Sequence, residues 1–124
     1  MRPIIWLLAI VLTSCVRPNS PDDRSLAREL AGYAAAAPQA CVLTLPSHSL
    51  RVIDSSTIAY DSRGTIYVNH LDGPCPALSS FNTLIVDAQP GRYCRGDRAR
   101  ALEPGALIPG PVCILGDWVP YHRR

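Results

Sequence analysis

Hydrophobic and polar residues are patterned in three different ways along the chain. Residues 3–12 form an unbroken apolar run, and residues 21–36 carry apolar side chains at helical spacing. From residue 41 onward, short runs rich in β-branched residues alternate with turns. We therefore expect an apolar leader, one helix that ends before Pro38, and a β domain.

The helical segment has a clear start but a weak apolar face. Ser20 is the expected N-cap, and Pro21 suits the first helical position. The apolar stripe consists of Leu26, Leu30, Tyr33 and Ala37. The alternative is an alanine-rich spacer that holds the domain away from a membrane. In either case, residues 15–40 are predicted to be a tether.

Six strands are expected in the remaining segment, residues 41–124: 42–45, 50–53, 57–60, 65–71, 81–88 and 112–121. The clearest pair is a hairpin whose four-residue loop, 61–64, ends in glycine. Alternation places Ile66, Val68 and His70 on the face expected to be the core side. The predicted fold is mainly β, a small antiparallel sheet or partly open barrel stapled by two disulfides and preceded by one short helix.

The apolar run ends in Leu12-Thr13-Ser14-Cys15. Its length of about ten residues fits a secretory leader and falls short of the ~20 needed to span a bilayer. The four residues resemble a bacterial lipobox, which implies removal of residues 1–14 and acylation of Cys15. By resemblance to sorted lipoproteins, Val16 after the cysteine favours the outer membrane, facing the periplasm. The alternatives are an ordinary cleaved signal with a chance cysteine, or a buried N-terminal helix.

Four cysteines remain after Cys15, an even number that indicates two disulfides in an oxidising compartment. Four cysteines allow three connectivities, and the sequence does not choose among them. We favour a nested arrangement with Cys75–Cys94 inside Cys41–Cys113, because the first closes a local loop and the second ties the first strand to the last. A zinc site is the rival, but the spacing lacks the usual C-x-x-C knuckle.

Composition narrows the function classes further. Residues 15–124 leave room for one small domain. Every basic residue is an arginine, and without Arg2 the 12 basic residues become 11 against 10 acids, a formal charge of +1. So small a net charge implies no nucleic-acid partner.

Three further segments of the chain contain a cysteine: Leu71-Asp72-Gly73-Pro74-Cys75-Pro76-Ala77-Leu78, Tyr93-Cys94-Arg95-Gly96-Asp97 and Val112-Cys113-Ile114-Leu115-Gly116. Together with the strand that begins at Cys41, they resemble a family of small proteobacterial lipoproteins with a domain of unknown function. The resemblance covers about residues 41–121. It implies an envelope location and paired cysteines, and it implies no activity.

One candidate site combines His70 and Asp72 with Asp97. If Cys75 paired with Cys94, the two carboxylates would approach each other beside the imidazole and could do acid–base chemistry or bind a cation. The interpretation that we favour is structural: these carboxylates cap turns.

Two surface features are also candidates. A basic run, Arg92, Arg95, Arg98 and Arg100, could contact an anionic glycan or lipid head group, but the interpretation we favour is a solvated loop. Trp118, Tyr121 and His122 could form an exposed aromatic patch, although a tryptophan in a last strand more often fills the open side of a sheet.

We therefore expect a lipid-anchored envelope protein that is not an enzyme and serves as an interaction or structural module. The alternative is an envelope lipoprotein that binds a small ligand or a metal through the residues above. The expected partners are the membrane, through the lipid, and an envelope protein or glycan. No nucleophile–base motif, cofactor motif or metal motif is recognisable.

Overall fold

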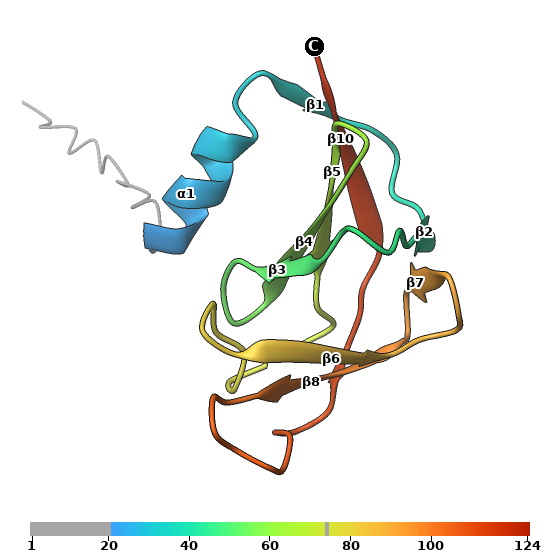
Figure 1. Ribbon diagram of the computed structural model, residues 1–124. Coiled ribbons are helices and arrows are strands. Elements are labelled where there is room, and N and C mark those ends of the chain that lie inside the picture. Colours follow the sequence, from blue (N-terminus) through green and yellow to red (C-terminus); the bar gives the residue numbers. More distant parts are fainter. Residues whose placement is uncertain (1–20, 74) are drawn as a thin grey trace, which may run out of the picture.

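A five-stranded antiparallel sheet is the central element of the fold (Figure 1). The computed structural model describes residues 21–73 and 75–124, in which one helix and ten strands are found. In chain order they are α1 Pro21–Glu29, β1 Tyr33–Ala35, β2 Cys41–Leu43, β3 Leu50–Val52, β4 Thr57–Ser62, β5 Thr65–His70, β6 Thr83–Asp87, β7 Arg92–Cys94, β8 Arg98–Leu102, β9 Cys113–Ile114 and β10 Trp118–Arg123.

The strands form three open sheets, all with antiparallel pairing. The central sheet has the order β1-β10-β5-β4-β3, a second sheet pairs β2 with β7, and a third has the order β6-β8-β9. The predicted class, a mainly β fold with antiparallel sheets, two disulfides and one short helix, is confirmed. The sheets are open and none closes into a barrel.

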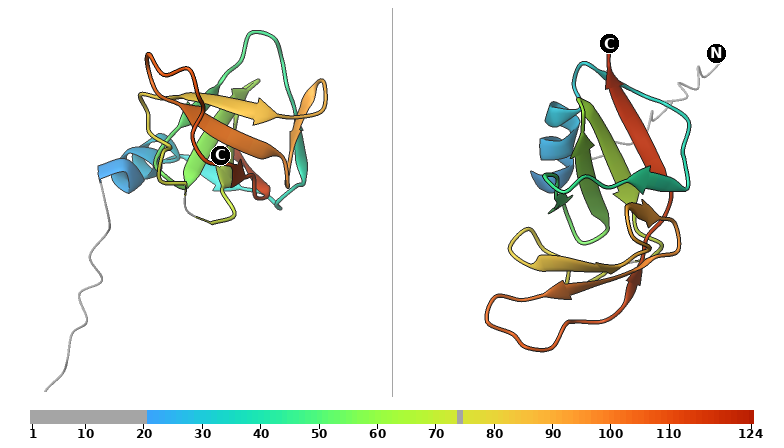
Figure 2. Two further views of the ribbon diagram at one scale, coloured as in Figure 1. Left: turned by 90° about the horizontal axis from the view of Figure 1, so that it is seen from below. Right: turned by 45° about the vertical axis from the view of Figure 1, so that its right-hand side comes forward.

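The central sheet separates two hydrophobic clusters. On one face Ala59, Ile66 and Val68 pack against α1 side chains, while on the other Ile58 and Tyr60 join a larger core beneath the two small sheets. Figure 2 shows α1 on one side of the central strands and β6 and β8 beyond their lower end. Because both faces are covered, β4 is buried over four consecutive residues instead of alternating.

The β4–β5 hairpin is confirmed, but its loop is shorter than predicted. Ser62 pairs with Thr65, so only Arg63 and Gly64 form the turn. Both have positive φ, 50° and 81°, as a type I′ turn requires. Ile66 and Val68 are buried as expected, whereas His70 at the strand end is exposed.

The prediction of a helix over 21–36 is wrong in its second half. The helix ends at Glu29, Gly32 takes a positive φ of 84°, and the following residues form β1 against β10. A glycine in the left-handed region ends helices because it has no Cβ to clash. Leu26 and Leu30 pack on the sheet, so this segment is part of the domain and not a free tether.

The expected last strand, 112–121, is divided into β9 and β10. Gly116 lies between them, where a Cβ atom would collide with the carbonyl oxygen of His70. The buried side chain of Asn69 fixes this approach. Its amide donates to the Gly116 carbonyl at 2.7 Å, and its oxygen accepts from the Gly116 N–H at 2.9 Å.

Two disulfides are present, but the nested pairing is wrong. The bonds are Cys41–Cys94 and Cys75–Cys113. The first joins directly opposed residues of β2 and β7, because these strands, rather than β2 and the last strand, are neighbours. The second is buried in the larger core, with its cysteines 1% and 7% exposed.

The leader and its candidate lipidation site, Cys15, lie outside the described residues. Within the described part of the chain, no helix has the length and apolarity needed to cross a bilayer.

Candidate functional site

His70 and Asp72, two of the three predicted site residues, line one shallow cavity of about 360 Å³. The His70 Nδ1 atom lies 3.2 Å from the Thr57 hydroxyl, and the Asp72 N–H donates to the carbonyl of Ile114 at 2.9 Å. The end of β5 and the start of the next loop therefore place both side chains at the same surface, as expected from their spacing.

Asp97 does not join this pair. Its carboxylate accepts a hydrogen bond from the Cys94 N–H at 2.7 Å, while its own N–H donates to the Cys94 carbonyl at 3.1 Å. It therefore caps a turn, which is the structural role that such residues commonly take. The approach of Asp97 to Asp72 was predicted from a Cys75–Cys94 bond, and the observed disulfides remove that basis.

The cavity beside His70 contains an ion pair. The Arg95 guanidinium lies 2.8 Å from the Asp117 carboxylate, and both side chains are about half exposed. In residues 21–73 and 75–124, no group of three histidine, cysteine or acidic side chains is arranged to hold a metal ion.

The four arginines of the predicted basic run differ in their surroundings. Arg92 donates to the side chain of Gln89, and Arg95 pairs with Asp117. Arg98 and Arg100 are exposed positions of β8, where they alternate with buried alanines. This segment was interpreted as a loop, although its R-A-R-A-L alternation is the pattern of a half-buried strand.

Trp118 is fully buried in the larger core, which confirms the favoured interpretation that it fills the open side of the sheet. The other possibility, an exposed aromatic patch that includes Trp118, is wrong. Tyr121 packs partly buried on the α1 side, and the exposed His122 lies 3.2 Å from the Thr65 hydroxyl.

A second site, which sequence reasoning missed, is a groove of about 540 Å³ between β3 and β6. Figure 1 shows these two strands one above the other, at the place where the central sheet meets the third sheet. The groove is lined by β3 residues, by the start of β6 and by two aromatic rings, together with three polar residues of the adjoining loops: Leu50, Arg51, Val52, Thr83, Leu84, His48, Tyr93, Ser49, Ser80 and Asn82.

Both strands that border the groove are sheet edges. In the described part of the chain, β3 is bonded only to β4, and β6 only to β8. An edge strand carries N–H and C=O groups without a ladder partner, and these groups are able to pair with another chain. The groove is therefore bordered on two sides by backbone hydrogen-bonding groups.

The pattern of ladder bonds identifies the free groups on β6. The N–H of Leu115 donates to the carbonyl of Asp97, and bonded and non-bonded pairs alternate along an antiparallel ladder. In β8, Ala99 therefore faces β9, while Arg98 and Arg100 face β6. Arg100 is opposite Ile85 and Arg98 is opposite Asp87, so the odd-numbered residues of β6 form the backbone hydrogen bonds with β8. The N–H and C=O groups of Leu84 and Val86 therefore point away from β8.

The same argument applies to β3. The N–H of Ile53 donates to the carbonyl of Thr57 at 2.9 Å, so Arg51 is the next residue bonded to β4. The backbone groups of Leu50 and Val52 consequently point outward. Their side chains are half buried against the larger core, as are those of Leu84 and Val86.

Aromatic rings lie at the end of the groove. The ring of Tyr93 meets that of Tyr60 edge to face, with centroids 6.0 Å apart, and His48 makes a similar contact on the other side of Tyr60 at 6.2 Å. Burial, together with the neighbouring Tyr60, raises the pKa of the Tyr93 phenol above its ordinary value. The phenol therefore stays neutral and able to donate a hydrogen bond throughout the physiological range.

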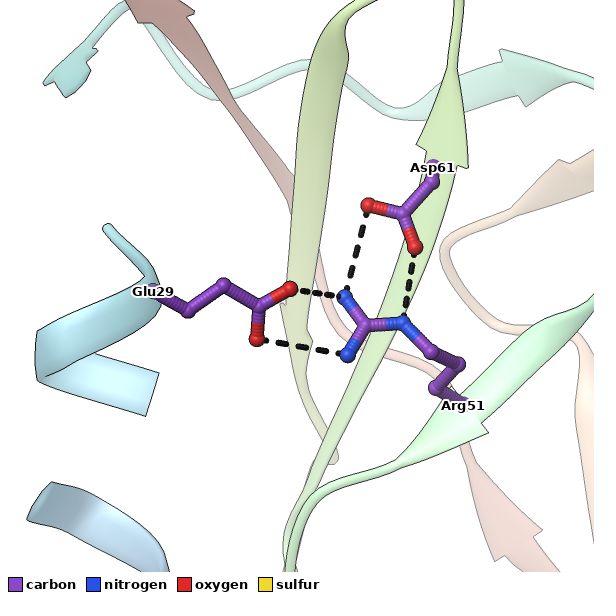
Figure 3. Close-up of polar contacts among 3 residues, drawn as sticks. All are labelled: Glu29, Arg51 and Asp61. Atoms are coloured by element: carbon purple, nitrogen blue, oxygen red, sulfur yellow. Dashed lines mark hydrogen bonds and ion pairs between the residues drawn. The ribbon is translucent and has the colours of Figure 1, made fainter. Parts of the chain in front are cut away.

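Arg51 keeps β3 in place from the opposite face (Figure 3). Its guanidinium lies 2.6 Å from the Glu29 carboxylate of α1 and 2.7 Å from the Asp61 carboxylate of β4. Burial lowers the pKa of Arg51, but the hydrogen bonds that its guanidinium donates to Asp61 and Glu29 outweigh this effect, and the net pKa is raised. Arg51 also lines the groove, but its charge is paired with these two carboxylates.

The sequence predicted the two strands that border this groove but not the groove itself. Strands near 50–53 and 81–88 were predicted, but whether a strand lies at a sheet edge depends on the order of strands in space. That order is set by contacts between distant segments, which no local pattern records.

Comparison with known proteins does not extend this description. No protein-family model matches the chain, and no curated protein and no solved structure is significantly similar to it. The resemblance to small proteobacterial lipoproteins, noted from the cysteine-bearing segments, therefore stays a prediction.

Proposed function

We propose that this protein is a non-catalytic binding module of the cell envelope, anchored by lipid on Cys15 to the outer membrane and facing the periplasm. The observation that carries the proposal is the groove between β3 and β6, which has two free strand edges, a lining of both polar and apolar side chains and a volume of about 540 Å³. Ligand-binding sites commonly have volumes of ~300–1,000 Å³.

The two disulfides support an envelope location. Disulfides persist in oxidising compartments such as the bacterial periplasm and are rare in the cytosol. Cys41–Cys94 and Cys75–Cys113 use every cysteine of the described residues. Cys41–Cys94 closes the second sheet, whose strand β7 carries the groove residue Tyr93, and Cys75–Cys113 ties β9 of the third sheet to the segment between β5 and β6.

The anchor places the domain close to the membrane. Five residues lie between Cys15 and Pro21, where α1 begins, so the two are six Cα–Cα steps apart (21 − 15 = 6). An extended segment of that length reaches at most about 20 Å. Two or more acyl chains contribute ~0.8 kcal/mol per buried methylene, which is enough for stable anchoring. A partner of this module is therefore expected within a short distance of the bilayer surface.

The test combines an intact mass with a positioned crosslinker. Protein extracted from the native membrane fraction and alkylated without reduction should have the mass of residues 15–124 plus acyl chains, with no alkylated thiol. A photo-crosslinking residue at Ser49, which lines the groove, should capture a defined partner, and the same residue at the nearby exposed Ser47 should not. An unprocessed chain with alkylated cysteines would contradict the anchor, and equal capture from both positions would contradict the groove.

A small-ligand function is the second candidate, and the cavity shared by His70 and Asp72 favours it. Arg95 in the same cavity suits a small anion with a carboxylate or phosphate group, although Asp117 already neutralises it. A thermal-shift series with inorganic phosphate and simple carboxylates tests this. Saturating ligand raises the apparent free energy of unfolding by ~2.7 kcal/mol at a hundredfold excess over Kd. An unchanged melting temperature throughout the series would exclude those ligands.

A further inference from the structure

We propose that the groove binds an extended peptide segment of a partner protein, which adds as a strand to the free edge of β6. This inference rests on the proposed binding function and specifies the class of partner. It explains why the groove is bordered by backbone groups, since an extended peptide is the ligand whose own N–H and C=O groups repeat with the spacing of a strand.

The free edge of β6 lacks the features that usually protect an unpaired strand edge. Proteins commonly protect such edges with proline, inward-pointing charges, bulges or very short strands. The five residues Thr83–Asp87 contain no proline, and their one charged residue is the last. The two residues with outward backbone groups, Leu84 and Val86, have apolar side chains. In contrast, β3 has only three residues.

The side chains of β6 and β3 determine which peptide sequences would bind at this edge. Neighbouring residues of paired strands share a face, so every second residue of the peptide would lie beside Leu84 and Val86. The residue beside Leu84, which lines the groove, would contact Leu50 and Val52 across it. Apolar residues are expected at both positions, because Leu84 and Val86 pack against the larger core. The intervening residues would lie beside the exposed Thr83 and Ile85, where polar residues are tolerated.

The opposite wall of the groove argues against a second copy as the occupant. Pairing of two copies through β6 would bring a whole sheet to this edge, and β3 stands on the other side of the groove with its own side chains. A single strand without a sheet behind it avoids this obstruction. Self-pairing nevertheless gives a distinct result in the experiment below.

Amide hydrogen exchange of the oxidised full chain, followed residue by residue by NMR, tests the proposal. The probes are acetylated and amidated heptapeptides in which valine, isoleucine, leucine or phenylalanine alternates with threonine. In the free protein, the amides of Leu84 and Val86 should exchange fast, and that of Ile85, which bonds to β8, should be protected. At least one peptide of the panel should slow exchange at Leu84 and Val86 by about tenfold or more.

Two controls separate strand addition from simple contact. The same peptide with N-methyl groups on its alternate pairing amides keeps its side chains but loses its donors, so it should give no protection. Ser49→Arg, at the exposed lip of the groove, should weaken binding about tenfold or more, whereas Ser47→Arg, exposed but outside the groove, should not.

Three results would overturn the inference. The first is a panel in which no peptide protects either amide, and the second is equal protection by the N-methylated peptide. The third is protection that depends on protein concentration and needs no peptide, which would show self-pairing. If the crosslinker at Ser49 still captured a partner after the first or second result, the binding function would stand and only the peptide class would fail.

Discussion

The buried amide of Asn69 should be one of the most sensitive positions in the fold. It is fully buried and makes two hydrogen bonds with the backbone of Gly116, at 2.7 and 2.9 Å. Asn69→Leu keeps a side chain of similar size but leaves the N–H and C=O of Gly116 without these partners. Each unpaired buried group costs ~1–3 kcal/mol, so the expected loss in free energy of unfolding is about 3 kcal/mol.

Urea unfolding of the oxidised protein, followed by circular dichroism, measures this loss. A loss of about 3 kcal/mol corresponds to a fall in melting temperature of about 12–24 °C for a domain of this size. The control is Asn82→Leu, because Asn82 donates one bond to the Ala77 carbonyl in a half-buried loop. That variant should lose about 1 kcal/mol. If both variants lose the same amount, the Asn69–Gly116 contact does not have the proposed importance.

Four further predictions follow from burial, charge and backbone conformation. Under mild thiol reduction, the half-exposed Cys41–Cys94 bond should open before the buried bridge, as differential alkylation and mass spectrometry would show. Arg63→Asn should stabilise the protein by about 0.5–1 kcal/mol in urea unfolding, since asparagine tolerates the positive φ at lower cost. Glu29→Gln should cost less than about 1 kcal/mol, and 1 M salt (a Debye length of about 3 Å) should shrink the difference, because the ion pair is one-third exposed. Because the pKa of Tyr93 is raised, its contribution to stability is full below pH 10 and is lost as the pH rises through the folded-state pKa; Tyr93→Phe should flatten that part of the stability profile.

The local parts of the fold were predictable from sequence. The β4–β5 hairpin has strong β-branched strands and a turn that contains glycine, and Ile66 and Val68 are buried as their alternation indicated. The start of α1 agrees with its proline at the first position. Its end was misplaced because alanines after Gly32 fit a helix and an edge strand equally well, and pairing with β10 decides between them.

The non-local parts were not predictable in the same way. Cysteine spacing indicated two disulfides, but the partner of Cys41 depends on β2 lying beside β7, which is 51 residues later at its start (92 − 41 = 51). The candidate triad failed for the same reason, since Asp97 was placed by assuming another pairing. The β3–β6 groove required knowledge of strand order, which is fixed only when all the sheets have formed.

The two disulfides overlap along the chain, and this has a consequence for how the molecule responds to proteases. A cut between residues 41 and 75 falls inside the first covalent ring, a cut between 94 and 113 falls inside the second, and a cut between 75 and 94 falls inside both. Two highly exposed apolar residues, Leu107 and Ile108, lie within the second ring. Cleavage there would turn one chain into two without releasing a fragment, and the nicked molecule would keep its mass plus one water until its disulfides were reduced.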